Sequence, residues 1–199
     1  MKAKKRKNKP GKIFIISGPS GSGKTTLLTR LIQDKKIAKL LVKSCSVTTR
    51  PKRFGERQGK DYFFVSKEEF RRLLKAKKIL EWTRYLGYYY GTPKGPVEKL
   101  LKAGRHLGLC LDLKGARILK KIYPQNTVTI FVLPPSLDVL KARIEGRCRE
   151  TNKQEISQRL RLAKKEMSAA RQFDYNVLNG DLQVALKDLK KIFLKENSA

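Results

Sequence analysis

The chain has 199 residues, enough for one domain with a sizeable core, and 40% are hydrophobic, which argues against wholesale disorder. Its 47 basic and 17 acidic residues give a formal net charge of +30, which predicts attraction to polyanions such as nucleotides, RNA or acidic membranes. A single histidine and three widely spaced cysteines argue against a zinc site or a disulfide framework, and no apolar run is long enough to span a bilayer.

The first ten residues are strongly basic and contain no acidic residue, so we expect a disordered tail at 1–10. The apolar run that follows, Ile13–Ile16, is too short for the core of a signal peptide. We therefore expect a cytoplasmic protein.

A glycine-rich loop stands between a predicted strand, Ile13–Ser17, and a predicted helix, Lys24–Gln33. Its glycines let backbone N–H groups point inward, and the helix N-terminus adds partial positive charge, so the loop can cradle a polyphosphate. Lys24 is expected to reach the outer phosphates and the Thr25 hydroxyl to ligate Mg²⁺. A chance match is the alternative, but the strand and helix favour a nucleotide-binding loop. The predicted ATP-binding residues here are Gly18, Pro19, Ser20, Gly21, Ser22, Gly23, Lys24, Thr25 and Thr26.

Strands and helices alternate through most of the remaining chain. Apolar runs predict strands at Leu107–Leu111, Val128–Leu133 and Tyr175–Leu178. Helical spacing predicts a short helix that Pro124 stops, a second helix that Ser136 caps, a long helix over 156–170 and a closing helix over 182–193. This alternation predicts an α/β fold: a parallel sheet with helices on both faces and the ligand at the C-terminal ends of the strands.

Residues 46–95 break this rhythm with many aromatic and turn residues and one helix, which opens at a capping box beginning with Ser66. We interpret them as an inserted subdomain, mostly of short strands. The charged residues 141–159 are interpreted as a mobile lid, and the core is expected to comprise 11–45, 96–140 and 160–199.

Several motifs occur in one order and spacing: SVTTRPKRFGE at 46–56, GKDYFFVS at 59–66, EW at 81–82, GYYYGT at 87–92, and shorter matches as far as VLN at 177–179. Together they resemble guanylate kinase from about Gly11 to Phe193. The resemblance implies a P-loop NTPase-type fold with a GMP-binding subdomain at 46–95 and a lid. It also implies transfer of the γ-phosphoryl group of ATP to GMP or dGMP, giving ADP and GDP.

Arg50 and Arg53 stand close together on one loop and can grip a phosphate monoester, helped by the hydroxyls of Tyr62 and Tyr90. A solvated basic loop is the alternative for the two arginines. The resemblance assigns all four residues to the GMP phosphate and Glu81 to the base. The implied GMP-binding residues are Ser46, Arg50, Arg53, Tyr62, Glu81, Tyr90, Gly91, Thr92 and Asp112.

Guanine presents N1–H and its 2-amino group as paired donors, which one carboxylate can accept, whereas adenine has no such pair. A buried carboxylate left without donors is costly, so we expect AMP to be rejected by about 10⁴-fold. Ser46 and Thr92 would make the remaining base contacts.

On the donor side, transfer between two anionic nucleotides depends mainly on positioning and on cations. Arg143 and Arg147 in the lid and Arg159 on the long helix match the family's lid arginines, and Asn179 matches a position near the ATP adenine. Mg²⁺ is the implied cofactor, held by Thr25 and by Asp112 through a water. The implied catalytic residues are Lys24, Arg50, Asp112, Arg143, Arg147 and Arg159.

The sequence departs from the family at three places. Cys110 replaces the first of two acidic residues, Lys114 replaces a glutamine, and Gly180 interrupts an Asn-Asp-Asp run. Activity is expected to survive because Asp112 remains. Two alternatives stay open: a catalytically weak guanylate kinase-like binding module, and an RNA association through the basic surface, which would be non-specific. The sequence does not indicate an oligomeric state.

Overall fold

The computed structural model describes residues 10–146 and 153–198. Residues 1–9 of the predicted tail at 1–10 and the lid residue Arg147 lie outside this part of the chain. The main sheet has five parallel strands in the order β2-β7-β1-β8-β9. The strands are β1 (Ile13–Ser17), β2 (Leu41–Lys43), β7 (His106–Cys110), β8 (Thr127–Leu133) and β9 (Tyr175–Leu178).

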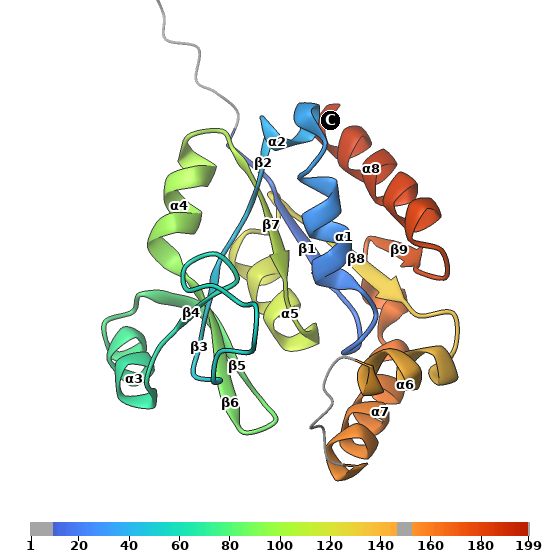
Figure 1. The fold of residues 1–199 in the computed structure, drawn as a ribbon. Coiled ribbons are helices and arrows are strands. Elements are labelled where there is room, and N and C mark those ends of the chain that lie inside the picture. The colour runs from blue at the N-terminus through green and yellow to red at the C-terminus, as the bar shows by residue number, and fades with distance from the viewer. Residues whose placement is uncertain (1–9, 147–152, 199) are drawn as a thin grey trace, which may run out of the picture.

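Helices cover both faces of this sheet (Figure 1). The four helices of the two faces are α1 (Lys24–Leu31), α4 (Lys94–Lys102), α5 (Leu113–Ile122) and α8 (Leu182–Ser198). Because side chains alternate along a strand, Phe14 and Ile16 pack with α1 and α8, while Ile13 and Ile15 pack with α4 and α5. The central strand is therefore buried on both faces, and the predicted α/β fold is confirmed.

Residues 46–93 contain a second sheet, with strands in the order β4-β3-β6-β5. The strands are β3 (Ser46–Thr48), β4 (Tyr62–Phe64), β5 (Ile79–Tyr85) and β6 (Tyr88–Pro93). One helix, α3 (Lys67–Lys75), begins where predicted, since the Ser66 hydroxyl accepts a hydrogen bond from the N–H of Glu69 at 3.0 Å. Its Phe70 stacks on Tyr89 of β6 with ring centroids 5.5 Å apart, which fixes the helix against the sheet.

Two helices stand beyond the C-terminal end of β8, α6 (Leu137–Glu145) and α7 (Lys153–Met167). Ser136 caps α6 as expected, accepting from the N–H of Val139 at 3.1 Å. Leu140 and Ile144 of α6 are buried against Ala163 of α7, so the two helices form a small packed unit beside the main domain.

The structure differs from the expected elements in several details. Helix α1 ends at Leu31 rather than Gln33, α7 ends at Met167, and Ala170 belongs to the 3₁₀ turn η1 (Ala170–Gln172). Strand β2, helix α4 and the short α2 (Lys35–Ala38), which Asp34 caps, were not expected from the sequence. No helix in the described part of the chain is both long and apolar enough to cross a membrane.

Candidate active site

The glycine-rich loop joins the C-terminal end of β1 to the N-terminus of α1. Gly23 caps α1 with φ of 98°, a left-handed conformation that favours glycine, and a Cβ there would lie 2.2 Å from Nδ2 of Asn179. That amide donates a hydrogen bond to the carbonyl of Ser22 at 2.7 Å. Asn179, which follows β9, therefore holds the loop by this hydrogen bond. Its amide also leaves no room for a side chain at Gly23.

Lys24 lies along the same loop. Its Nζ donates to the carbonyls of Gly18 at 2.6 Å and Pro19 at 2.9 Å. Among the described residues, the buried hydroxyls of Ser17 and Ser22 have no hydrogen-bond partner. The loop and the end of β1 thus bring together a lysine ammonium group and two buried hydroxyls without a hydrogen-bond partner, and a lysine on a glycine-rich loop is typical of a phosphate site.

Of the three expected lid arginines, Arg159 contacts this loop and Arg143 contacts Asn179, which holds the loop. Arg159 is buried on α7 and donates from Nη1 to the Ser20 hydroxyl at 3.3 Å. Arg143 on α6 donates from Nη2 to the carbonyl of Asn179 at 3.0 Å. Within the described ranges, Nη1 of Arg143 is buried without a hydrogen-bond partner. A buried guanidinium N–H without an acceptor is costly, so this atom marks a position where an anion would be stabilised.

The second sheet carries a cluster of arginine and tyrosine side chains. The buried Arg50 donates from Nη2 to both carboxylate oxygens of Glu56, at 2.7 and 3.0 Å, and lies over the ring of Tyr62 at 5.5 Å. Tyr62 and Tyr90 meet edge to face with centroids 6.0 Å apart, and burial raises the pKa of Tyr62 to about 12. The Tyr62 phenol is therefore a neutral hydrogen-bond donor at physiological pH.

The remaining phosphate candidate, Arg53, is exposed, and its backbone N–H donates to Glu56 at 2.8 Å. The structure therefore brings Arg50, Tyr62 and Tyr90 together but leaves the Arg53 side chain in solvent. No role was assigned to Glu56 from the sequence, although it stands six residues after Arg50 in the motif at 46–56. Its carboxylate fixes both the Arg50 guanidinium and the loop that carries Arg53.

A buried carboxyl group lies deeper in the same region. Glu81 on β5 is 4% exposed and accepts a hydrogen bond from the Thr92 hydroxyl at 2.6 Å. Burial, reinforced by the nearby charge of Asp112, raises the pKa of Glu81 to about 7. Ser46 lies on β3, opposite Tyr62 in the register, and Gly91 pairs with Val47. The structure thus brings Glu81, Thr92 and Asp112 together, and their part in GMP binding stays a prediction.

Asp112 lies near this carboxyl group, at the N-terminus of α5. It caps α5, accepting from the N–H of Gly115 at 2.8 Å. Glu166 on α7, which the sequence reasoning missed, interacts electrostatically with both Asp112 and Lys24, and burial raises the pKa of Glu166 to about 7. Seven residues separate it from Arg159, so the two share one face of α7, and this spacing was the available signal.

Comparison with known proteins identifies the family of the chain. The family model for guanylate kinase matches residues 10–196. The chain belongs to the guanylate kinase family. It is 42% identical over 191 residues to guanylate kinase of Mycoplasma mobile, covering 94% of each chain. It is 43% identical over 177 residues to guanylate kinase of Thermosynechococcus vestitus, covering 89% of this chain and 90% of the relative.

Guanylate kinase from Anaplasma phagocytophilum provides a similar crystal structure. It superposes with a TM-score of 0.78 at 31% identity, covering 94% of this chain and 87% of that one. The expected family, fold class and phosphotransferase activity are therefore confirmed.

Two of the departures from the guanylate kinase pattern can be placed in the structure. Cys110 ends β7 beside Thr25 and Lys24, and burial raises the pKa of its thiol, so the position carries no negative charge at neutral pH. Lys114 on α5 places its ammonium group 5.1 Å from the ring centroid of Trp82 on β5. Lys114 therefore connects the main domain to the second sheet.

Proposed function

We propose that this guanylate kinase binds ATP at the loop 18–26 and GMP or dGMP against the second sheet, and transfers the γ-phosphoryl group between them. The observation that carries the proposal is the buried carboxyl group of Glu81, which accepts a hydrogen bond from Thr92 and lies near Asp112, the residue that caps α5. Between the proposed base-recognising group and the phosphate-binding loop, Asp112 influences the charge of Glu81, and Glu166 interacts electrostatically with both Asp112 and Lys24. We also propose that residues 46–95 form the GMP-binding subdomain and that residues 141–159 form the lid.

Guanine is the base that this pocket fits. Ionised Glu81 accepts both N1–H and the 2-amino group, while Thr92 orients the carboxylate. The main support for Glu81 as the specificity residue is its burial, because a buried carboxylate discriminates strongly between partners that supply donors and those that do not. Ser46 and Gly91 complete the proposed base pocket.

The GMP phosphate is proposed to bind Arg50, Tyr62 and Tyr90, with Arg53 joining from its exposed position once the anion is present. Bound phosphate would compete with Glu56 for Nη2 of Arg50, which already donates to both carboxylate oxygens, so the guanidinium group needs little reordering. The phosphate itself supplies the nucleophilic oxygen, so no additional general base is required.

On the donor side, Lys24 and the backbone of the loop are proposed to hold the ATP phosphates, and Arg143 and Arg159 to stabilise the charge that spreads over the moving phosphoryl group. Arg147 is proposed to act with them from the lid. Asn179, beyond holding the loop, is proposed to lie near the adenine.

Mg²⁺ is the metal that these residues fit. The exposed Thr25 hydroxyl and Asp112 offer oxygen ligands, and no group of three or more His, Cys, Asp or Glu side chains gathers as a protein cage in the described residues. This matches a cation held mainly by nucleotide phosphates and water. Mg²⁺ would neutralise phosphate charge, while the residues named above position the reactants.

A cytoplasmic location, where both nucleotides are available, is part of the proposal. The basic surface would add non-specific attraction to polyanions, including nucleic acid.

Product analysis tests the function. The protein, incubated with ATP, Mg²⁺ and GMP, should release ADP and GDP in equal amounts. Lys24→Ala is the matched inactive control, and omission of Mg²⁺ should abolish both products. Failure of the wild-type chain to form GDP, under conditions where a known guanylate kinase does, would refute the proposal.

A further inference from the structure

Tyr85 ends strand β5, on the same face of the strand as Glu81. Residues 81, 83 and 85 alternate with the more exposed Trp82 and Arg84, as side chains on one face of a strand do. Tyr85 lies four residues beyond Glu81, about 13 Å along the strand. It is therefore carried by the proposed acceptor subdomain but lies away from the base pocket.

The Tyr85 hydroxyl lies among groups from three different parts of the molecule. It is beside the Ser20 hydroxyl of the ATP loop and interacts electrostatically with Arg159 and Glu166 of α7 and with Tyr90 of β6. Ser20 in turn accepts a hydrogen bond from Arg159 at 3.3 Å. Ser20 of the ATP loop thus interacts both with Tyr85 of the second sheet and with Arg159 of α7.

The turn that follows Tyr85 is strained. Tyr85 pairs with Tyr88 across the residues Leu86 and Gly87, whose φ angles are 49° and 84°. Positive φ at both central positions matches the twist of a tight hairpin, but it is unfavourable for a bulky side chain such as that of Leu86. The hairpin therefore holds Tyr85 at a defined place, and a strained residue beside an active site is a common sign of a functional constraint.

We propose that Tyr85 is a positioning residue for phosphoryl transfer, which holds the GMP-binding subdomain against Ser20 and Arg159 when the two nucleotides lie in line. The inference rests on the proposed roles of the ATP loop and Arg159. Tyr85 acts through these groups, so it sets the distance between the reactants and excludes water from the space between them. Burial raises the pKa of Tyr85, which keeps its hydroxyl protonated and able to donate a hydrogen bond.

Tyr85→Phe tests the proposal, because it removes the hydroxyl and keeps the ring. We expect kcat for GDP formation to fall by about three- to tenfold, the worth of one hydrogen bond, with both KM values within about twofold of wild type. We also expect ADP release to exceed GDP formation, because a loosened contact lets water replace GMP as the acceptor of the phosphoryl group. A merely structural role would not change the ratio of the two products.

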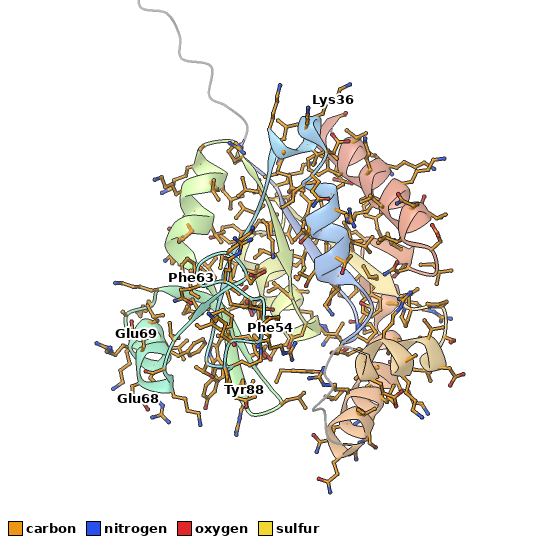
Figure 2. The ribbon with its side chains drawn as sticks, in the orientation of Figure 1. Lys36, Phe54, Phe63, Glu68, Glu69 and Tyr88 are labelled. Atoms are coloured by element: carbon orange, nitrogen blue, oxygen red, sulfur yellow. The ribbon has the colours of Figure 1, made fainter. Side chains whose placement is uncertain are left out.

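Tyr88→Phe is the matched control. Tyr88 is the cross-strand partner of Tyr85, but it is exposed on the other arm of the same hairpin (Figure 2). This variant should keep wild-type kcat and equal amounts of the two products. Emission from Trp82, the single tryptophan and a neighbour on β5, reports whether the hairpin is intact in each variant.

A double-mutant cycle with Ser20→Ala decides whether Tyr85 acts through the loop. Once the Ser20 hydroxyl is gone, Tyr85→Phe should cost nothing further in kcat. Wild-type kcat and equal products in Tyr85→Phe, or effects of the two substitutions that multiply, would overturn the inference while leaving the proposed function in place. Absence of GDP formation by the wild-type chain would instead refute the proposed function and, with it, the inference.

Discussion

Glu81 and Gly115 face each other across the boundary between the second sheet and α5. A Cβ at Gly115 would lie 2.7 Å from Oε2 of Glu81 and 3.3 Å from Oδ1 of Asp112. The missing side chain therefore leaves space for the carboxylate that we propose reads the guanine base. This close approach also explains how the first turn of α5 can lie against the base pocket.

Gly115→Ala should separate binding from stability. Alanine in a helix is favoured over glycine by about 0.5–1 kcal/mol, so the free energy of unfolding should not fall. The new methyl group would displace the Glu81 carboxylate, so KM for GMP should rise by about tenfold while KM for ATP stays unchanged. Steady-state kinetics with each nucleotide varied in turn check both values.

Gly95→Ala is the control for that substitution. Gly95 lies in α4, and a Cβ there meets nothing within 4 Å. Both KM values should match wild type. An equal rise of the GMP KM in the two variants would show that the space beside Glu81 is not what matters.

The affinity for GMP should depend on pH through Glu81. The pKa of its carboxyl group is raised to about 7, and only the ionised form accepts two N–H donors. Below pH 7 the group is protonated in the free protein, so GMP binding should weaken as pH falls, by up to about tenfold per unit. Above pH 7 the carboxylate is already formed and the dependence should level off.

Glu81→Gln isolates this contribution, because the GMP phosphate also titrates and keeps doing so in the variant. We expect the variant to bind GMP about 10- to 100-fold more weakly and to lose the part of the pH dependence that belongs to the carboxyl group. Calorimetric titrations of both proteins between pH 5.5 and pH 8.5 (about three units) measure the difference. Identical pH profiles would contradict the assignment of Glu81 to the base.

Much of this arrangement could be predicted from the sequence, where local patterns carry the information. The apolar run of β1, the loop Gly18–Thr25 and the Ser136 cap are signals within a few residues of one another. Helix α4 was missed because Gly95 and Pro96 are typical of a turn. Proline is nevertheless tolerated in the first turn of a helix, where its missing N–H would have no partner. Strand β2 was missed because it has only three residues at the sheet edge.

The residues of the candidate site also differ in how far the sequence reveals them. Glu81 and Thr92 stand in motifs that can be recognised along the chain, and Glu166 has the helical spacing from Arg159, whereas Gly115 and Tyr85 become relevant only when separate segments meet. The contact between Gly115 and Glu81 joins residues 34 positions apart, and nothing in the sequence around Gly115 indicates it. Tertiary contacts of this kind leave no local pattern to detect.

Gly23→Ala should disable the ATP loop. It places a Cβ 2.2 Å from the amide of Asn179 and forces alanine into φ of 98°. We expect a loss of about 1–3 kcal/mol in the free energy of unfolding and at least about tenfold weaker ATP binding. Chemical denaturation and nucleotide titration measure the two effects.

Gly180→Ala, next to Asn179, serves as the control because its Cβ would meet only an ordinary contact at 3.8 Å. Its stability and ATP affinity should stay near wild type. A neutral Gly23→Ala variant would show that the support from Asn179 does not shape the loop.

Arg143→Met should reduce turnover without unfolding the protein. It removes the buried Nη1 that lacks a partner, and it also removes the hydrogen bond to the Asn179 carbonyl. These effects oppose each other, so the free energy of unfolding should change by less than about 1 kcal/mol. We expect kcat to fall by about 100-fold or more, since the proposed role of Arg143 is to stabilise the charge on the transferring phosphoryl group. Turnover near wild type would exclude Arg143 from the reaction.

The central claim is that a buried carboxylate selects guanine for phosphoryl transfer from ATP. The most direct test is kcat/KM measured with GMP, AMP, CMP and UMP as acceptors under identical ATP and Mg²⁺ concentrations. We expect GMP to be preferred over AMP by about 10⁴-fold, because adenine offers no paired donors to Glu81. Equal kcat/KM values for GMP and AMP would contradict the claim.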